Sequence, residues 1–151
     1  MARRNAAPGA LGYWRYSQSY LRAADASFYE GGDKVMFPVL YLYGIAIELS
    51  LKAFLLARGE TPAAVAAYSH RLNDLLNRAR RRKLGYKVQL IQNDLRAIRL
   101  LSQSYAHQPH RLRYFTAGLV QVPALEVTQN AARRLVTGLK AYCAAQTLGK
   151  K

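Results

Sequence analysis

The chain has 151 residues, of which 51% are hydrophobic and 21% are charged, a size and composition typical of one globular domain. Its 23 Lys and Arg outnumber its 8 Asp and Glu, which gives a formal net charge of +15 at pH 7. Five prolines and ten glycines exclude a low-complexity chain. A surface this positive favours nucleic acid as a partner, then an acidic protein or membrane surface, although a generally arginine-rich composition would look the same.

Apolar residues recur at helical spacing and no long stretch alternates as a strand would, which predicts an all-α fold. We expect residues 1–11 to form a flexible N-terminus. The first helix is predicted to run from about residue 12 to residue 29 and to end at the pair Gly31 and Gly32. Its expected inner face comprises Tyr13, Ser17, Tyr20, Leu21, Ala24 and Phe28.

The second helix is predicted to begin near Pro38 and to end at Gly59. Within it, Glu48 and Lys52 lie four residues apart on one face among hydrocarbon side chains, so they must pair or one must be neutral. We expect a buried structural pair, the alternative being a site that binds a polar ligand or tunes a proton transfer. A second face carries small residues that would let another helix approach, within the chain or across a dimer: Ala46, Ser50, Ala53 and Ala57.

Two further helices are predicted between the second helix and a loop at 107–121. Thr61 and Pro62 suit the start of a short helical piece at 62–68, and Ser69 is expected to cap a helix at 70–83 that ends at Gly85. Another helix should span 87–105. The predicted inner residues of these two longer helices are Leu72, Leu75, Leu76 and Ala79, then Val88, Ile91, Leu95, Ile98, Leu101 and Tyr105.

Pro123 is expected to open the last helix, which would run to about residue 146 and leave residues 147–151 as a frayed basic tail. The single cysteine, Cys143, cannot form an intrachain disulfide, which favours a reducing compartment. No secretory signal is visible, and charged residues interrupt the apolar run 35–47 before the ~20 residues that a bilayer requires. We therefore predict a cytoplasmic protein without membrane association, folded at 12–146 as a single up-and-down antiparallel bundle of four to five helices.

Three motifs follow one another in a characteristic order: YLYGIAIELSLKAFLLARG at 41–59, SHRLNDLL at 69–76 and SYAHQPHRLRYF at 104–115. In this order, after a tyrosine-rich first helix, the chain resembles the HEPN superfamily (higher eukaryotes and prokaryotes nucleotide-binding domain) in its small free-standing bacterial form, over roughly residues 13–142. The resemblance implies a HEPN-like bundle that is commonly a homodimer. It also implies a role in RNA cleavage, toxin–antitoxin pairs or phage defence, or non-catalytic binding of RNA or a nucleotide, with a small nucleotidyltransferase or an antitoxin as partner.

The family's ribonucleases resemble one another in an Arg, four to six residues and then a His. Such a pair could act on one phosphate, because His moves a proton and Arg stabilises the developing charge. The nearest candidates here are Arg99 and His107, which are separated by seven residues. On a continuous helix the two side chains would point roughly 80° apart. A metal-independent endoribonuclease is thus one hypothesis; in the other, Arg99 is simply solvated and His107 starts the loop.

Basic residues gather in two places, around the end of the helix predicted at 70–83 and in the loop at 107–121, where they lie beside Tyr114 and Phe115. Guanidinium groups that grip phosphates beside rings that stack on bases suit an RNA strand. The alternative is a solvated charged end, with Tyr114 and Phe115 packed into the bundle. The candidate nucleic-acid-binding residues are Arg80, Arg81, Arg82, Lys83, Arg111, Arg113 and Tyr114.

His70 is expected to be a packed structural histidine rather than a base, and its ring could reach the Glu48–Lys52 pair or Asp74 one turn on. In the first case Glu48, Lys52 and His70 form a buried polar cluster. His107 and His110 are too few to bind a metal, and we predict no metal and no cofactor. Together these features predict a protein that binds RNA or a nucleotide and leave cleavage undecided. The alternative function is a non-catalytic helical interaction module that dimerises or binds an acidic partner protein.

Overall fold

The computed structural model describes residues 8–105, residue 112 and residues 120–148, and this part of the chain is helical with no strand. The all-α helical bundle predicted from the sequence is confirmed. The six α-helices are α1 (Ala10–Gly31), α2 (Met36–Ala57), α3 (Pro62–Ala66), α4 (Leu72–Arg81), α5 (Gln92–Tyr105) and α6 (Leu125–Leu148), with 3-10 turns η1 (Gly32–Val35) and η2 (Leu84–Tyr86).

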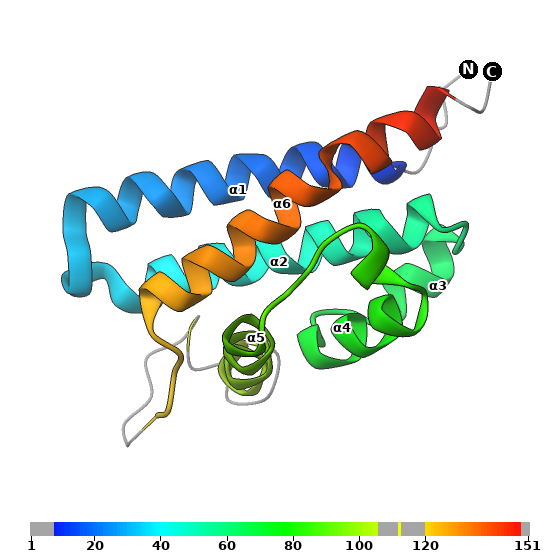
Figure 1. Cartoon of the computed structure of the whole chain (residues 1–151). Coiled ribbons are helices and arrows are strands. Elements are labelled where there is room, and N and C mark those ends of the chain that lie inside the picture. Colours follow the sequence, from blue (N-terminus) through cyan, green and yellow to red (C-terminus); the bar gives the residue numbers. More distant parts are fainter. Residues whose placement is uncertain (1–7, 106–111, 113–119, 149–151) are drawn as a thin grey trace, which may run out of the picture.

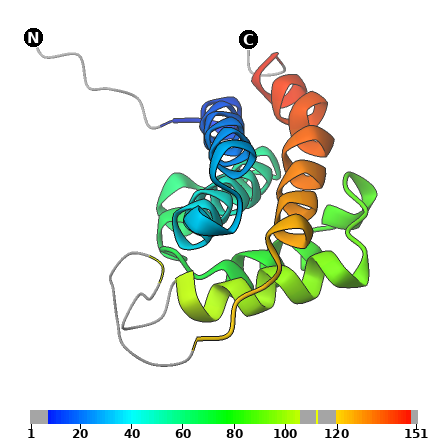
Figure 2. The ribbon, with the colours of Figure 1, turned by 90° about the vertical axis from the view of Figure 1, so that its left-hand side faces the viewer.

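The helices are arranged around α2, which contacts every other α-helix of the bundle. Helices α1 and α2 form an antiparallel pair, and α6 crosses both of them obliquely (Figure 1). Helix α5 is seen end-on in Figure 1 and from the side in Figure 2, so it lies across the long helices rather than along them. The start of α1 and the end of α6 lie at the same end of the molecule (Figure 1).

Helix α2 is the core of the fold because it is apolar on nearly all sides. Its stripe of small residues, Ala46, Ser50, Ala53 and Ala57, is buried within this single chain, which answers whether that face needs a second subunit to cover it. The α1–α2 region also contains one segment long and apolar enough to cross a membrane, but 78% of its most apolar window is buried inside the fold. Burial of this kind is typical of a core helix in a globular protein.

The buried face of α1 is centred on a tryptophan that the predicted inner face left out. Ser17, Leu21 and Ala24 are buried as predicted, whereas three predicted aromatic residues of this helix are only half-buried. Trp14 is buried instead, and its Nε1 donates a hydrogen bond of 2.7 Å to the backbone carbonyl of Val136 in α6. This bond connects the first and last helices across 122 residues of sequence.

Helices α4 and α5 begin later than predicted. Ser69 has a φ of 51° and does not cap α4, whose N-cap residue is Arg71. Helix α5 begins at Gln92 because the carboxylate of Asp94 accepts a 2.9 Å hydrogen bond from the backbone N–H of Ile91, a cap that ends the extended segment before it. Ile91 was predicted to face inward and is 51% exposed.

The predicted inner faces of the two helices are otherwise confirmed, since Leu72, Leu75, Leu76 and Ala79 of α4 are buried with Leu95, Ile98, Leu101 and Tyr105 of α5. At the end of α4 it is Lys83, not Gly85, that takes the left-handed conformation, with a φ of 72°. The helix piece predicted after Thr61 is present as α3, and the Thr61 Oγ1 accepts a 3.1 Å hydrogen bond from the Ala64 N–H.

Substitution of Trp14 by Phe should lower the free energy of unfolding by about 1–3 kcal/mol, because the buried hydrogen bond between α1 and α6 is lost and the smaller ring leaves part of its space unfilled. Urea denaturation monitored by far-UV circular dichroism measures the change. The matched control is Tyr16→Phe on the exposed side of α1, which should stay within about 0.5 kcal/mol of wild type. Equal effects of the two substitutions would contradict the assigned role of Trp14.

Candidate functional site

A cluster of polar side chains lies in the interior of the bundle around Glu48. Lys52 Nζ is 2.7 Å from Glu48 Oε1, and the two side chains are only 9% and 6% exposed. The α-helical spacing of four residues places the acid and the base side by side, as predicted. Because the pair is nearly removed from water, its attraction is screened little, and loss of either charge would leave the other without compensation.

Two further side chains bring α5 and the segment before α4 to the same carboxylate. The Tyr105 hydroxyl donates to Glu48 Oε2 at 2.5 Å, and His70 Nδ1 lies 3.0 Å from that oxygen. The His70 side chain is 56% exposed, so the expectation of a packed histidine is wrong although its contact with Glu48 is present. The other edge of its ring is therefore open to solvent.

Gly44 makes room for the tyrosine of this cluster. A Cβ placed on Gly44 would come within 2.7 Å of Cδ2 of the Tyr105 ring, so the ring lies directly against the backbone of α2. One helical turn after Gly44, the carboxylate of Glu48 is in position to accept a hydrogen bond from the Tyr105 hydroxyl. The sequence predicted that Tyr105 faces inward, but it did not predict that Glu48 is the hydrogen-bond partner of Tyr105. The available signal was that a buried tyrosine hydroxyl needs an acceptor.

A second carboxylate organises the basic end of α4. Glu60, which follows α2, forms an ion pair with Arg78 at 2.5 Å and a longer one with Arg82 at 3.9 Å. Arg82 Nη2 also donates to the backbone carbonyl of Arg58 at 2.6 Å. Arg82, which the sequence placed among the nucleic-acid-binding residues, is thus engaged in fastening α4 to the end of α2.

The remaining basic residues of this region, Arg80, Arg81, Lys83 and Lys87, face solvent. Together with the exposed Tyr86 they define what we call the α4–η2 surface. The four cations form no ion pair with the described residues. Tyr86 is 81% exposed, with Lys83 Nζ 6.0 Å from its ring centroid. Lys87 Nζ lies 4.7 Å from the ring centroid of Tyr142 in α6. An exposed ring among cations is the combination that single-stranded nucleic acid binds.

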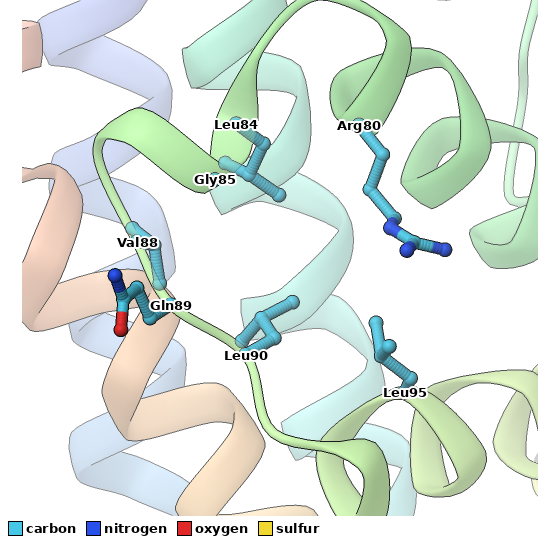
Figure 3. A pocket seen from close by; sticks show the side chains of 7 residues that line it. All are labelled: Arg80, Leu84, Gly85, Val88, Gln89, Leu90 and Leu95. Atoms are coloured by element: carbon cyan, nitrogen blue, oxygen red, sulfur yellow. The ribbon is translucent and has the colours of Figure 1, made fainter.

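A pocket of about 420 Å³ opens beside this surface, and we call it the α4–α5 pocket (Figure 3). All of its lining residues belong to the stretch from Arg80 to Leu95, in which the chain leaves α4, passes through η2 and enters α5. Arg80 therefore belongs both to the exposed cations and to the wall of the pocket. The sequence offered no signal for a pocket here, because it depends on the extended segment that was predicted to be helical.

The predicted catalytic pair is only partly within the described residues. Arg99 is exposed on α5, which agrees with the alternative hypothesis that this side chain is simply solvated. His107 lies outside the described residues, as do His110 and the other predicted nucleic-acid-binding residues of that loop, Arg111, Arg113 and Tyr114. The described residues therefore do not include the distance between Arg99 and His107, and a catalytic role for this pair stays a prediction.

Another polar cluster joins α1, α2 and α6 on the opposite side of α2. Asp25 Oδ1 accepts hydrogen bonds from the Tyr43 hydroxyl at 2.7 Å and from Gln129 Nε2 at 2.9 Å, and Arg133 lies 3.2 Å from Oδ2. Burial, and then the hydrogen bond to Asp25, raise the pKa of Tyr43 well above its usual range, so the phenol stays protonated. Nearby, the buried Asp94 pairs with Arg134 of α6 at 2.5 Å. These contacts are explained by helix packing.

No family model, curated protein or solved structure matches the chain.

Substitution of Glu48 by Gln should lower the free energy of unfolding by about 3–5 kcal/mol, since Lys52 is left buried and unpaired. Lys52→Met should also destabilise, and the double variant should lose less than the sum, with a coupling energy of about 0.5–3 kcal/mol measured by urea denaturation. The control cycle uses Arg71 and Asp74, an exposed pair at 3.4 Å that should couple by less than about 1 kcal/mol. Additive losses at Glu48 and Lys52 would contradict a buried pair.

Proposed function

We propose that this chain is a HEPN-like protein that binds RNA or a nucleotide through the α4–η2 surface, in the cytoplasm and within a toxin–antitoxin or phage-defence type system. One observation carries the proposal. Four exposed cations that pair with no described acidic side chain follow one another from the end of α4 through η2, together with the exposed ring of Tyr86. One of them, Arg80, also lines the neighbouring pocket. Phosphates can bind the cations while unpaired bases stack on the ring.

At this end of α4 some basic side chains are paired with an acid and others are not, and this difference supports the proposal. Glu60 neutralises Arg78 and contacts Arg82, so these two residues serve the fold. No described acidic side chain pairs with Arg80, Arg81, Lys83 or Lys87, although these four like charges fall within eight residues of sequence and repel one another. A polyanion relieves that repulsion and gains affinity by releasing counterions.

RNA cleavage is an extension of the same proposal. Arg99 would stabilise the charge on the phosphate and His107 would transfer the proton, across the two subunits of a homodimer. A small nucleotidyltransferase or an antitoxin would be the natural partner. Exposed aromatic residues on α1, Tyr16 and Tyr29, support the second candidate, a non-catalytic interaction module, because exposed tyrosines are common in protein interfaces.

Binding of a short single-stranded RNA, measured by fluorescence anisotropy over a salt series, tests the proposal. Affinity should fall with salt with a slope of about −0.7 for each phosphate contact. Removal of the four surface charges by Arg80→Gln, Arg81→Gln, Lys83→Gln and Lys87→Gln should lower both the affinity and the slope.

The control variant removes four exposed charges elsewhere: Arg15→Gln, Arg22→Gln, Lys34→Gln and Lys140→Gln. It has the same net charge as the first variant, so it separates a local surface from overall basicity. Absence of binding to the RNA and to nucleoside monophosphates at low salt would contradict the proposal and favour the interaction module. Equal losses in the two variants would show that no particular surface binds the RNA.

A further inference from the structure

We propose that the α4–α5 pocket holds one unpaired nucleobase, so that the protein selects single-stranded RNA or a free nucleotide over duplex. The inference rests on the proposed function and specifies how its ligand is held. A base can enter a pocket only when its faces and edges are free of a duplex, and RNA-binding proteins read such unstacked bases. The four cations of the surface then contact the phosphates on either side of that base.

The shape of the pocket follows from the path of the chain. Between Arg80 and Leu95 the backbone passes around the cavity from α4 through η2 and the extended segment to α5 (Figure 3). The volume of about 420 Å³ lies within the ~300–1,000 Å³ range of small-molecule sites. Because the extended segment separates the two helices, the cavity is open to solvent next to the α4–η2 surface.

The wall of the pocket has the chemistry that a base requires. Four branched aliphatic residues line the pocket, Leu84, Val88, Leu90 and Leu95. Leu84, Val88 and Leu95 are buried, so the half-buried Leu90 offers most of the apolar contact for a ring face. Arg80 reaches toward Leu95 from the other side of the cavity (Figure 3). A guanidinium plane stacks on a base, and its N–H groups can also bind a phosphate.

Gly85 leaves one side of the pocket without a side chain. A Cβ placed on it meets nothing within 4 Å. Its φ is not positive, so a larger residue can take its backbone conformation. Gly85→Leu therefore adds a large side chain at the edge of the pocket without removing a charge or a core contact.

The charge around the pocket favours a nucleotide over other occupants. An apolar chain would match the aliphatic wall but would have no use for Arg80, and inorganic phosphate would use the cations but not the wall. A nucleotide satisfies both, and the exposed ring of Tyr86 offers a stacking surface for the next base. The sizes and charges thus match a base linked to phosphate.

The test uses the whole chain and two sets of probes. Methyl NMR of Val88 and Leu90 is recorded with the four nucleoside monophosphates, with ribose 5-phosphate, with inorganic phosphate and with an acidic peptide. RNA affinity is measured for one sequence in single-stranded and duplex form. The variants are Gly85→Leu, Arg80→Gln and, as the control that removes a neighbouring charge outside the pocket wall, Arg81→Gln.

We expect the monophosphates, but not ribose 5-phosphate, phosphate or the peptide, to shift the methyl resonances of the pocket. Gly85→Leu should weaken single-stranded RNA binding about tenfold, leave the salt dependence unchanged and abolish the preference over duplex. Arg80→Gln should weaken both monophosphate and RNA binding. Arg81→Gln should weaken RNA binding alone. Thermal unfolding verifies that each variant is folded.

Three results would overturn the inference: monophosphates that shift no pocket methyl, equal shifts with ribose 5-phosphate or the peptide, or a Gly85→Leu variant that is folded and binds RNA like wild type. In each case salt-dependent RNA binding that requires the four cations would leave the proposed function standing. Conversely, monophosphate binding in the pocket without RNA binding would reject RNA as the ligand and keep the pocket.

Discussion

The fold depends on the need of one buried carboxylate for partners. Glu48 sits in the most apolar helix of the chain, where an isolated charge would cost many kcal/mol. Lys52 of the same helix, Tyr105 of α5 and His70 before α4 all contact it. These contacts can form together only when the elements that carry them occupy their observed positions around α2. The cluster therefore specifies an arrangement that hydrophobic contact alone would leave less defined.

Helix α4 is held in place by two carboxylates, one within α2 and one just after the end of α2. This placement gives the candidate site its geometry. Glu48 contacts His70 before the first turn of α4, and Glu60 contacts Arg78 and Arg82 at its last turns. The apolar face of α4 packs inward between these two points. The next residues must then travel back to α5 outside a helix, which creates the pocket and exposes the α4–η2 surface. Glu60 thus holds Arg78 and Arg82, while the neighbouring cations of the α4–η2 surface stay available for a ligand.

Much of this could be predicted where a pattern is local. The ion pair of Glu48 and Lys52 followed from four-residue spacing in an apolar helix, and the buried face of α4 followed from its periodicity. The start of α5 could not be found in this way, because the carboxylate of Asp94 ends an extended segment whose apolar residues also fit a helix. Trp14 was missed because its helix offers aromatic residues on neighbouring faces, and only the position of α6 selects among them. The pocket depends on the same distant contacts.

The most direct test is the accessibility of the Lys52 ammonium group. Acylation of the native protein with an amine reagent, followed in time by peptide mass spectrometry, compares Lys52 with the exposed Lys34 and Lys140 in the same molecule. If Lys52 is held against Glu48 inside the bundle, the exposed lysines should react fully while Lys52 reacts only as fast as the protein unfolds. Reaction of Lys52 at the rate of Lys34 and Lys140 would contradict the buried pair and the arrangement of α4 and α5 derived from it.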